Sequence, residues 1–449
     1  MKTLSCLLAF TQVALSSCAQ GPASPLPAPD PSSDDNETIQ RLVTSGSIDI
    51  IIPAGKTYRI TRPITITNKH ISALGCRFVI SSDGGDSCGS ISIVGSTLNG
   101  GEYYTDASPN FGNTIDGSSV LKLTNSSAVS CLVYSQLSYC MRASGKITID
   151  SCKLFGGGYS SLEIQGDFSG LLVTHNMINN SGARYIGEKI YSTPKKSGIG
   201  IHLSPSTNVD NVQIINNVLD YNGHSGIWAN GGSHAISDLT ITNNRISNTG
   251  TCLTEGGSAV RCTESGTCIE VINCPKSEIT LNYTFRPLGY NIAVAKGSNN
   301  TRVYKNTCIG ASGDPGVYTG FADDVVIDEN DVGFSTYGLS IGESGPSRNC
   351  IVRNNNVHDN TYAPLLFNNG SNLTIEGNTI RQYVFSSAYE GKGAVKHRDA
   401  CRIGAGADSV FSAGNTFTGN FNALYTPNGG LPKTISSKGD KISFPISPH

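Results

Sequence analysis

Residues 302–309 read RVYKNTCI and residues 326–333 read VIDENDVG, so an aliphatic stretch leads into Asn-x-(apolar) twice. The phrase recurs at steps of 24, 24, 25 and 23 residues, at Asn282, Asn306, Asn330, Asn355 and Asn378. A period of this length, built from short apolar alternations and Gly/Asn turns without a helical pattern, predicts a solenoid of stacked β-strands. An Asn at the same place in each coil would form a ladder, because its amide can donate to one neighbouring coil and accept from the other.

The phrase extends in both directions, to Asn176, Asn217, Asn244 and Asn415, and Cys152 takes the same place one step before Asn176. Where the interval widens to 41, 38 or 37 residues, the additional length must leave the coil as a loop. The three predicted loops cover residues 183–197, 250–266 and 384–400.

The composition of the chain fits one elongated domain. A solenoid of 449 residues grows along one axis and needs no division into separate cores. Charged residues make up 15% of the chain and the net charge is −2, which excludes a general nucleic-acid binder, since such a protein would carry a basic excess.

The amino-terminal residues predict export. Lys2, an apolar stretch from Leu4 to Leu15 and the small residues 16–19 are typical of a secretory signal over residues 1–19, too short to span a bilayer. Two processing routes fit: cleavage after Ala19, or lipidation of Cys18 in a sequence that resembles a bacterial lipobox. No other run is apolar enough to cross a membrane, so we expect a protein that is secreted or tethered to the cell surface.

The remaining boundaries follow from local signals. Residues 20–35 are rich in Pro, Ser and Asp and should form a flexible leader. An Asp/Asn cap and three apolar positions predict a short helix over residues 36–43, and residues 48–60 alternate like strands around a Pro-Ala-Gly turn. We expect the solenoid to occupy residues 36–435 and the last residues, 436–449, to form a tail.

The helix followed by IIIPAGKTYRITRPITI (50–66) resembles the amino-terminal cap and first coil of right-handed parallel β-helix proteins of the pectate-lyase-like superfamily. With the Asn phrases, the resemblance covers roughly residues 36–430 and implies an all-β, single-stranded right-handed parallel β-helix. It implies no single activity, because that superfamily includes lyases, hydrolases, epimerases and phage tailspikes.

Twelve cysteines lie beyond the predicted signal, and an even number in an exported chain indicates disulfides. Cys131 with Cys152, and Cys252 with Cys274, stand 21 and 22 residues apart, so each pair could lie on adjacent coils. Alternatively, cysteines occupy apolar ladder positions as free buried thiols. No Cys-x-x-Cys motif is present, which argues against a zinc or redox site, and calcium is the one cofactor left open. Seven Asn-x-Ser/Thr sequons occur, at Asn36, Asn125, Asn179, Asn282, Asn299, Asn369 and Asn372.

A second strand follows a Gly turn in most coils, and aligning these strands shows which side chains would stack outward. Period-2 alternation places Ile, Val and Leu inside and leaves a polar and aromatic row on one solvent face. The row contains Glu163, Gln165, His202, Trp228, Asn230, Glu270 and Tyr318. Aromatic rings pack on sugar rings, and amides and carboxylates bind hydroxyls, so the row predicts a saccharide-binding groove. The alternative is an ordinary polar face with one exposed aromatic residue.

The first long loop adds positive charge. Residues 183–197 include Arg184, Tyr185, Lys189, Tyr191 and Lys195, and they enter between the coils of Glu163 and His202. Cations beside a sugar groove would suit an anionic polysaccharide. A solvated basic loop is the alternative, and the cations of residues 389–398 belong to a loop several coils away.

A lyase must neutralise a uronate carboxylate, remove the C5 proton and protonate the leaving oxygen. Arg142, Lys189 or Lys195 could neutralise, His202 could be the base, and Tyr185 or Tyr191 the acid. A hydrolase needs two carboxyls about 5–5.5 Å apart (retaining) or about 6.5–9.5 Å apart (inverting). Glu163 and Glu270 lie three coils apart, near ~14 Å, which leaves Glu163 with Asp167 or Glu188 as a pair.

Motifs of individual families are mostly missing. The NTD, GHG and RIK elements of polygalacturonases are absent. Residues 198–227 resemble the repeat of alginate C5-epimerases, but the catalytic Tyr and Asp of that repeat are replaced. AVAKGSNNTRVYKNT (293–307) is similar to the Lys-bearing coil of chondroitinase and alginate lyases, from which only Lys296 carries over, as a substrate-binding residue.

The sequence therefore predicts an exported enzyme that cleaves an acidic polysaccharide by β-elimination. A glycoside hydrolase, a C5-epimerase-like enzyme and a non-catalytic solenoid for glycan binding or surface attachment are the alternatives.

Overall fold

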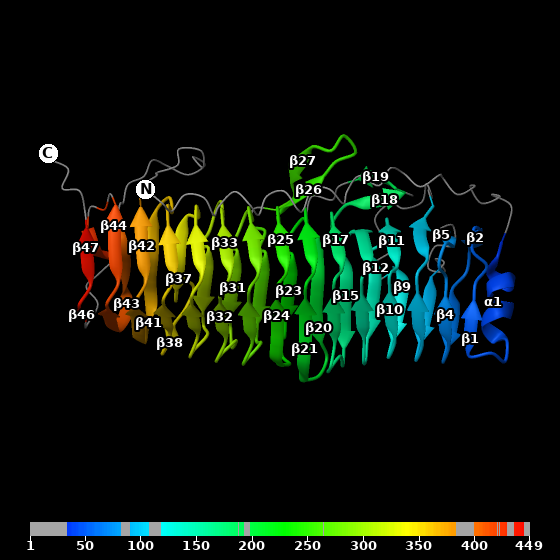
Figure 1. The fold of residues 1–449 in the computed structure, drawn as a ribbon, viewed down its shortest axis with the longest axis horizontal. Helices are drawn as coiled ribbons and strands as arrows, with labels where there is room; N and C mark the ends of the chain where they lie inside the picture. Colours follow the sequence, from blue (N-terminus) through cyan, green and yellow to red (C-terminus); the bar gives the residue numbers. More distant parts are fainter. Residues whose placement is uncertain are drawn as a thin grey trace, which may run out of the picture.

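The computed structural model describes residues 34–81, 90–106, 118–186, 188–192, 198–263, 265–382, 399–419, 421, 423–428 and 435–443. Within these residues the chain winds into a parallel β-helix, one coil behind the next along a single axis (Figure 1). The predicted all-β solenoid is therefore confirmed. The signal over residues 1–19, most of the leader and the loop cations of residues 389–398 lie outside the described residues.

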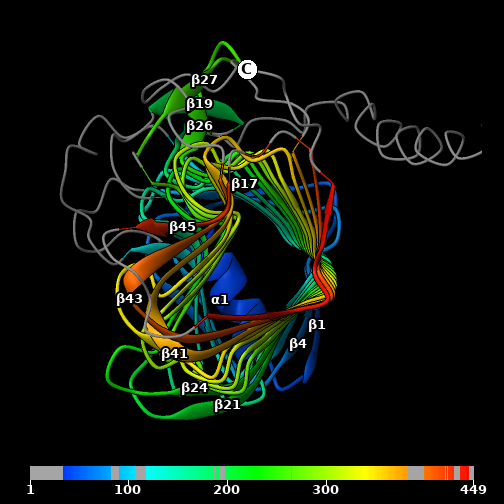
Figure 2. The same ribbon diagram turned by 90° about the vertical axis from the view of Figure 1, so that its left-hand side faces the viewer.

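Each coil contributes one strand to each of three faces, and Figure 2 shows the three-sided outline along the axis. The first face is a sheet of 15 strands. In order these are β2 (Thr57–Ile60), β5 (Arg77–Ile80), β8 (Glu102–Thr105), β11 (Leu132–Ser135), β14 (Lys153–Gly156), β17 (Met177–Asn179), β22 (Val218–Asp220), β25 (Arg245–Ser247), β30 (Tyr283–Phe285), β33 (Thr307–Ile309), β36 (Asp331–Gly333), β40 (Asn356–His358), β42 (Thr379–Gln382), β44 (Thr416–Gly419) and β47 (Lys441–Ser443).

The second face follows the first along each coil. Its strands are β3 (Ile64–Thr67), β6 (Ile91–Val94), β9 (Ser119–Thr124), β12 (Tyr139–Ser144), β15 (Ser160–Gly166), β20 (Ile199–Pro205), β23 (Ile227–Asn230), β28 (Ile269–Ile272), β31 (Ile292–Ala295), β34 (Val317–Gly320), β37 (Tyr337–Ile341), the first parts of β41 (Ala363–Glu376) and β43 (Asp399–Ala413), and β45 (Ala423–Asn428).

The third face completes each coil. Its strands are β1 (Asp49–Ile51), β4 (His70–Ser72), β7 (Thr97–Asn99), β10 (Ser127–Val129), β13 (Thr148–Asp150), β16 (Leu172–Thr174), β21 (Val209–Ile215), β24 (Ile236–Thr242), β29 (Glu278–Thr280), β32 (Arg302–Tyr304), β35 (Val326–Asp328), β38 (Ser347–Arg348), β39 (Ile351–Arg353), the later parts of β41 and β43, and β46 (Ile435–Lys438).

Two antiparallel hairpins stand outside the coils. They are β18 (Arg184–Ile186) with β19 (Lys189–Ser192), and β26 (Thr251–Leu253) with β27 (Ala259–Arg261). Figure 1 shows the two hairpins next to each other on one side of the solenoid. They occupy two of the three loops that the sequence predicts.

Helix α1 (Asn36–Thr44) covers the amino-terminal end of the solenoid, as predicted (Figure 1). Its inward positions Ile39 and Val43 are buried, so its apolar stripe closes the core of the first coil. The Asn36 side chain ties the helix to that coil, because its Nδ2 donates to the carbonyl of Arg62 at 2.7 Å.

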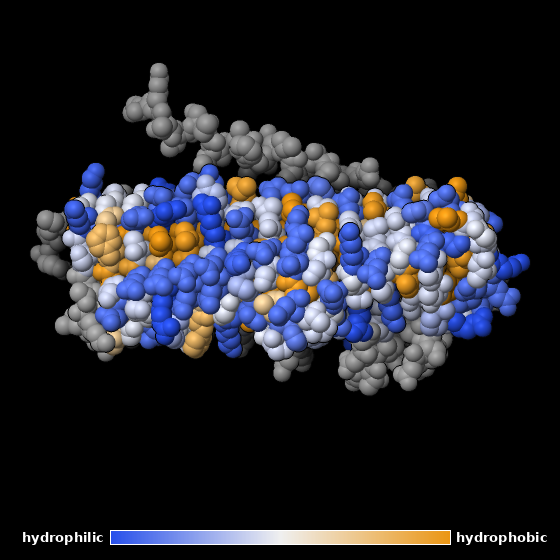
Figure 3. Space-filling model, turned by 90° about the horizontal axis from the view of Figure 1, so that it is seen from below, coloured by the Kyte–Doolittle hydropathy of each residue, from blue (hydrophilic) through white to orange (hydrophobic). Residues whose placement is uncertain are grey.

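The core consists of aliphatic residues stacked at the same position of successive coils. Ile201, Ile227 and Ile269 are direct neighbours in the register of β20, β23 and β28, and all three are fully buried. Each such side chain contributes about 1.5–3 kcal/mol through its burial. The outward positions are mainly hydrophilic, and Figure 3 shows such a surface, interrupted by separate apolar patches.

The predicted Asn ladder is confirmed at the corner between the third and first faces. The Nδ2 of Asn282 donates to the carbonyl of Ile241 (2.8 Å) and to the Oδ1 of Asn306 (3.0 Å), and the same Oδ1 accepts the Asn282 backbone N–H (2.9 Å). This pattern repeats along the ladder, which contains Asn176, Asn217, Asn244, Asn282, Asn306, Asn330, Asn355, Asn378 and Asn415.

The predicted boundary at residue 435 is wrong. Strand β46 pairs with β43 and β47 pairs with β44, so coil structure continues to Ser443 and only residues 444–449 lie beyond it. The sequence signal for these strands is short, and their pairing partners lie a full coil away. No helix in the described part of the chain is long and apolar enough to cross a membrane.

The cysteines named as pairs are free thiols. Cys131, Cys152, Cys252 and Cys274 are each buried and unbridged, so the alternative of buried thiols at apolar positions describes them. Two sequons are also accounted for by the fold, because the amides of Asn36 and Asn282 make hydrogen bonds inside the structure.

Candidate functional site

The predicted outward row is real in its alignment. On the second face, Arg142 pairs with Glu163, Glu163 with His202, and His202 with Trp228 in the register of β12, β15, β20 and β23. The same row, here called the second-face row, runs through Lys122, Arg142, Glu163, His202, Trp228, Glu270, Ala293, Tyr318 and Ser340. Residues dozens of positions apart in the sequence are thus neighbours along one face.

A buried carboxylate and an imidazole form the best-defined pair in the row. The Oε2 of Glu163 lies 2.8 Å from the Nδ1 of His202, and Glu163 is 1% exposed. Its oxygens also accept hydrogen bonds from the Ser160 hydroxyl and the Gln165 amide, both at 2.8 Å. Glu163 is therefore satisfied on all sides and fixes the orientation of His202. No hydrogen bond within the described chain uses the second ring nitrogen of His202, Nε2.

Aromatic rings surround His202. Its ring stacks on Trp228 with centroids 5.0 Å apart, and the rings of Tyr159 and His224 lie 6.2 Å from His202 and 5.6 Å from Trp228. The Nε1 of Trp228 is buried and has no hydrogen-bond partner in the described residues. Burial lowers the pKa of His224, as does the neighbouring His202, so His224 is held neutral. The wall thus offers ring faces and one unused donor.

Two cations precede the pair. Lys122 is exposed, and Arg142, in the next coil, donates from Nε to the Oε1 of Gln165 at 3.2 Å. Since Gln165 in turn donates to Glu163, a chain of contacts links Arg142 to His202.

An acidic cluster, which the sequence did not reveal as a unit, lies further along the same face. It contains Glu270, Asp314 and Glu343. Burial raises the pKa of Glu270, which the charge of Lys296 partly offsets. Burial also raises the pKa of Glu343, to which the charge of Asp314 adds, although Oε2 of Glu343 accepts a hydrogen bond from Ser340 at 2.8 Å.

Two tyrosines accompany the acidic cluster. The rings of Tyr290 and Tyr318 are 4.8 Å apart, and burial together with nearby carboxylates raises the pKa of Tyr290. Tyr318 and Glu270 were predicted from the alternation of strands. Asp314 and Glu343 lie in turns next to β34 and β37, where alternation gives no signal.

The first hairpin lies elsewhere than predicted. Lys189, Tyr185 and Glu188 line a pocket over the first face, so they are not neighbours of Glu163 and His202. The physical reason is that Tyr185 packs on the aromatic residues Tyr134 and Phe155 of that face. A Glu163–Glu188 catalytic pair is therefore excluded, as is Tyr185 as the acid beside His202.

The remaining predicted residues lie at the edges of the row. Arg184 approaches the turn before β15, where an added Cβ on Gly158 would be 3.1 Å from its Nε. Asp167 is exposed in the turn after β15, and the Oδ1 of Asn230 accepts the Gly232 N–H at 3.1 Å. The side chain of Tyr191 and all of Lys195 lie outside the described residues.

The described part of the chain contains no group of three or more His, Cys, Asp or Glu side chains that could hold a metal ion. A role for calcium stays an untested prediction.

Comparison with known proteins gives the following matches. Among solved structures, similar chains include tailspike protein 3 of bacteriophage CBA120 (12% identity, TM-score 0.39, 94% of this chain and 60% of that chain). They also include the A-module of the mannuronan C-5 epimerase AlgE6 from Azotobacter vinelandii (12% identity, TM-score 0.46, 92% and 96%). A third is the catalytic unit of the GH87 α-1,3-glucanase from Streptomyces thermodiastaticus strain HF3-3 (13% identity, TM-score 0.44, 92% and 67%). This chain thus spans 60% of the length of the tailspike.

At such identities the likeness concerns the fold alone. No curated protein matches the chain. The family model described as "Right handed beta helix region" matches residues 64–308 and 199–430, well over half of the chain. The chain therefore belongs to the family of right-handed β-helix proteins.

Proposed function

We propose that the protein is an exported polysaccharide lyase that cleaves an acidic polysaccharide on its second face, with His202 as the base. The observation that carries the proposal is the 2.8 Å hydrogen bond between the buried Glu163 and the Nδ1 of His202. A carboxylate that receives the Nδ1 proton fixes the tautomer in which Nε2 has a free lone pair, and it stabilises the imidazolium after proton transfer. Export is consistent with the predicted signal over residues 1–19 and with Cys18 as a lipid-anchor site.

The reaction balances with the groups present in the row. The Nε2 of His202 removes the C5 proton of a uronate, and the electron pair left on C5 forms the C4–C5 double bond as the C4–O bond breaks. Lys122 and Arg142 are the cations nearest to His202 in the second-face row, and their charge favours the carboxylate whose acidity the reaction needs.

Tyr159 is the acid that protonates the leaving oxygen. Its ring is 6.2 Å from that of His202, and it is 41% exposed, so it can reach a bound polymer. Burial and the charge of Glu163 raise the pKa of Tyr159, so its hydroxyl stays protonated until it donates. Tyr159 takes the role that the sequence had suggested for Tyr185 or Tyr191.

Hydrolysis is the second candidate, and the acidic cluster favours it. A glycosidase needs one carboxyl that is protonated near neutral pH and one that is ionised. The raised pKa of Glu343 suits the acid, and Asp314, whose charge contributes to that rise, suits the base.

A paired assay separates the two candidates. Polyuronates and neutral polysaccharides are incubated with the full chain, while the ultraviolet absorbance of the unsaturated product and the number of reducing ends are both recorded. We expect absorbance to rise on a polyuronate, His202→Ala to lower the rate by about 10²–10⁴-fold, and Glu343→Gln to have little effect. The matched control is His175→Ala, a histidine on the exposed surface whose Nδ1 contacts Asp150.

Three results would contradict the lyase proposal. Reducing ends without absorbance, together with loss of activity in Glu343→Gln, would support hydrolysis. Full activity in His202→Ala would remove the base. Quenching of Trp228, the single tryptophan, by a polymer that is never cleaved would support a binding protein.

A further inference from the structure

Both hairpins fold over the first face and enclose a pocket with a volume of about 480 Å³. Its lining includes Tyr134 and Phe155 from the coils, Tyr185 and Glu188 from the first hairpin, and Glu255 from the turn of the second. We call it the hairpin pocket. It lies on a different face from the Glu163–His202 pair, so the proposed cleavage makes no use of it.

The floor of the hairpin pocket is an aromatic stack on the outside of the sheet. Ring centroids are 5.3 Å apart between Tyr104 and Tyr134 and 4.6 Å apart between Tyr134 and Phe155. The next position in register is Asn179, so the stack ends at Phe155. The Oδ1 of Asn179 is buried and has no partner in the described residues. An apolar ring thus borders an unused hydrogen-bond acceptor.

The wall of the pocket is formed by Tyr185, whose position is fixed from two sides. Its hydroxyl accepts a hydrogen bond from the Nδ2 of Asn180 at 3.0 Å. The Oδ1 of Asn180 accepts the backbone N–H of Leu253 in the second hairpin at 2.7 Å. Because one side chain bonds to both hairpins, the pocket keeps its shape without a ligand, which lowers the entropic cost of binding.

Glycine is required beneath this wall. A Cβ on Gly156 would lie 2.7 Å from the Cδ2 of Tyr185 and 2.5 Å from the carbonyl of Ser135, and its φ of +87° is in the region that favours glycine. The sequence of β14 is therefore adapted to the ring that packs on it.

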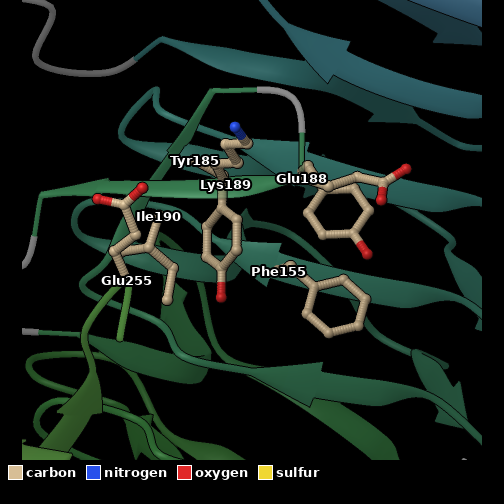
Figure 4. A pocket seen from close by; sticks show the side chains of 7 residues that line it. Phe155, Tyr185, Glu188, Lys189, Ile190 and Glu255 are labelled. Carbon is tan, nitrogen blue, oxygen red and sulfur yellow. The ribbon is translucent and has the colours of Figure 1, made fainter. Parts of the chain in front are cut away.

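We propose that the hairpin pocket is a second, non-catalytic binding site for a neutral sugar unit of a glycan. Tyr134, Phe155 and Tyr185 offer apolar rings to the C–H faces of a sugar, and the carboxylates of Glu188 and Glu255 accept hydrogen bonds from hydroxyl groups. Figure 4 shows the ring of Tyr185 between Phe155 on one side and Ile190 and Glu255 on the other.

The charge of the pocket selects against a polyanion. Two carboxylates line it, and Figure 4 shows the amino group of Lys189 directed away from the rings. Glu188 accepts the Tyr104 hydroxyl through Oε1 at 3.3 Å, which leaves Oε2 for a ligand. A volume of about 480 Å³ is in the usual range for small-molecule sites, roughly 300–1,000 Å³. The second face, with Lys122 and Arg142, has the opposite preference.

Calorimetric titration of the full chain with neutral gluco-, manno- and galacto-configured tetrasaccharides, and with a tetrauronate, tests the proposal. We expect at least one neutral tetrasaccharide to bind, and Phe155→Ala and Glu255→Ala each to raise its Kd by roughly tenfold. Glu255 is exposed, so its substitution does not endanger folding. The matched control, Tyr283→Ala, removes an exposed aromatic of the same face and should change nothing. His202→Ala should also retain this binding.

Several outcomes would overturn the proposal. One is that no neutral tetrasaccharide binds to the wild type. Another is that binding survives both Phe155→Ala and Glu255→Ala. A third is that the tetrauronate competes for the same site with higher affinity. Quenching of Trp228 by the neutral sugar would place its binding on the second face and would equally refute the assignment. None of these outcomes depends on whether the protein cleaves a polymer.

Discussion

Replacement of Asn306 by Ala should destabilise the solenoid far more than its single amide suggests. The Oδ1 of Asn306 accepts the backbone N–H of Asn282 at 2.9 Å, and its Nδ2 donates to the carbonyl of Ile279 at 2.8 Å. Both partners are inside the coil, where no water replaces the lost bond. Asn282 and Asn306 are each at most 1% exposed.

The magnitude follows from the groups that are left unpaired. A buried donor or acceptor without a partner costs about 1–3 kcal/mol, and the substitution orphans one N–H and one carbonyl, for a total of about 2–6 kcal/mol. The Nδ2 of Asn282 also loses its bond to Asn306, but it retains the carbonyl of Ile241, so it adds little. An effect of this size is a large share of the stability of a typical domain, about 5–15 kcal/mol.

Urea unfolding followed by circular dichroism measures the loss, and amide hydrogen exchange locates it. Protection should fall first in the coils next to β32 and β33, since each coil of a solenoid contacts mainly its neighbours. The matched control is Asn208→Ala, an exposed asparagine outside the ladder that makes one hydrogen bond, from the Ala235 N–H. If Asn306→Ala costs no more than Asn208→Ala, the ladder does not stabilise the fold as argued.

Two further predictions concern pH and the hairpin pocket. Its hydrogen bond to Asp331 raises the pKa of His358 above the unfolded value of about 6.5, so this stabilisation is complete at lower pH and is lost as pH rises through the folded pKa. In urea unfolding, the wild type should exceed His358→Gln by about 1.5–3 kcal/mol near pH 5.5 and by less near pH 8.5, and an equal difference would contradict the assignment. Gly156→Ala should displace Tyr185, cost about 1–3 kcal/mol and abolish calorimetric binding of neutral sugar while cleavage persists; loss of both would contradict separate sites.

The rows of the solenoid were predictable because two periods act together. A spacing near 24 residues brings a position back to the same place in the next coil, and alternation in the strand decides whether it faces outward. Glu163, His202 and Trp228 satisfy both conditions, and their alignment is confirmed in the register. The same reasoning identified the asparagine ladder, since one residue type recurs at one place.

The hairpins obey neither period, which explains why their direction was predicted wrongly. Position in the sequence showed that residues 183–197 leave between two coils, but not over which face they fold. The choice is made by contacts that no repeat specifies, such as Tyr185 against Phe155 and the hydrogen bond from Leu253 to Asn180. Asp314 and Glu343 escaped prediction for a related reason, because turn residues have no alternation to be read.

The position of the hairpins in the coil has a physical basis in the ladder. At the corner between the third and first faces, two residues separate the strands in every coil of the ladder, as between β16 and β17 or between β32 and β33. The first of the two takes a positive φ, for example 53° at His175 and 54° at Lys305, and the second is the ladder asparagine. An insertion there would move one amide out of line and leave partners unpaired in both neighbouring coils.

The corner between the first and second faces has no such constraint. All three long insertions leave the coil there, after β17, β25 and β42. A loop at this corner can fold over either adjacent face without breaking the core, so it is the part of the coil where binding surfaces can be added at little cost in stability. Phe155 and Glu163 belong to one coil and lie on opposite sides of this corner, in β14 and β15. The proposed sugar pocket and the proposed catalytic row are therefore both adjacent to the one corner that the ladder leaves free to vary.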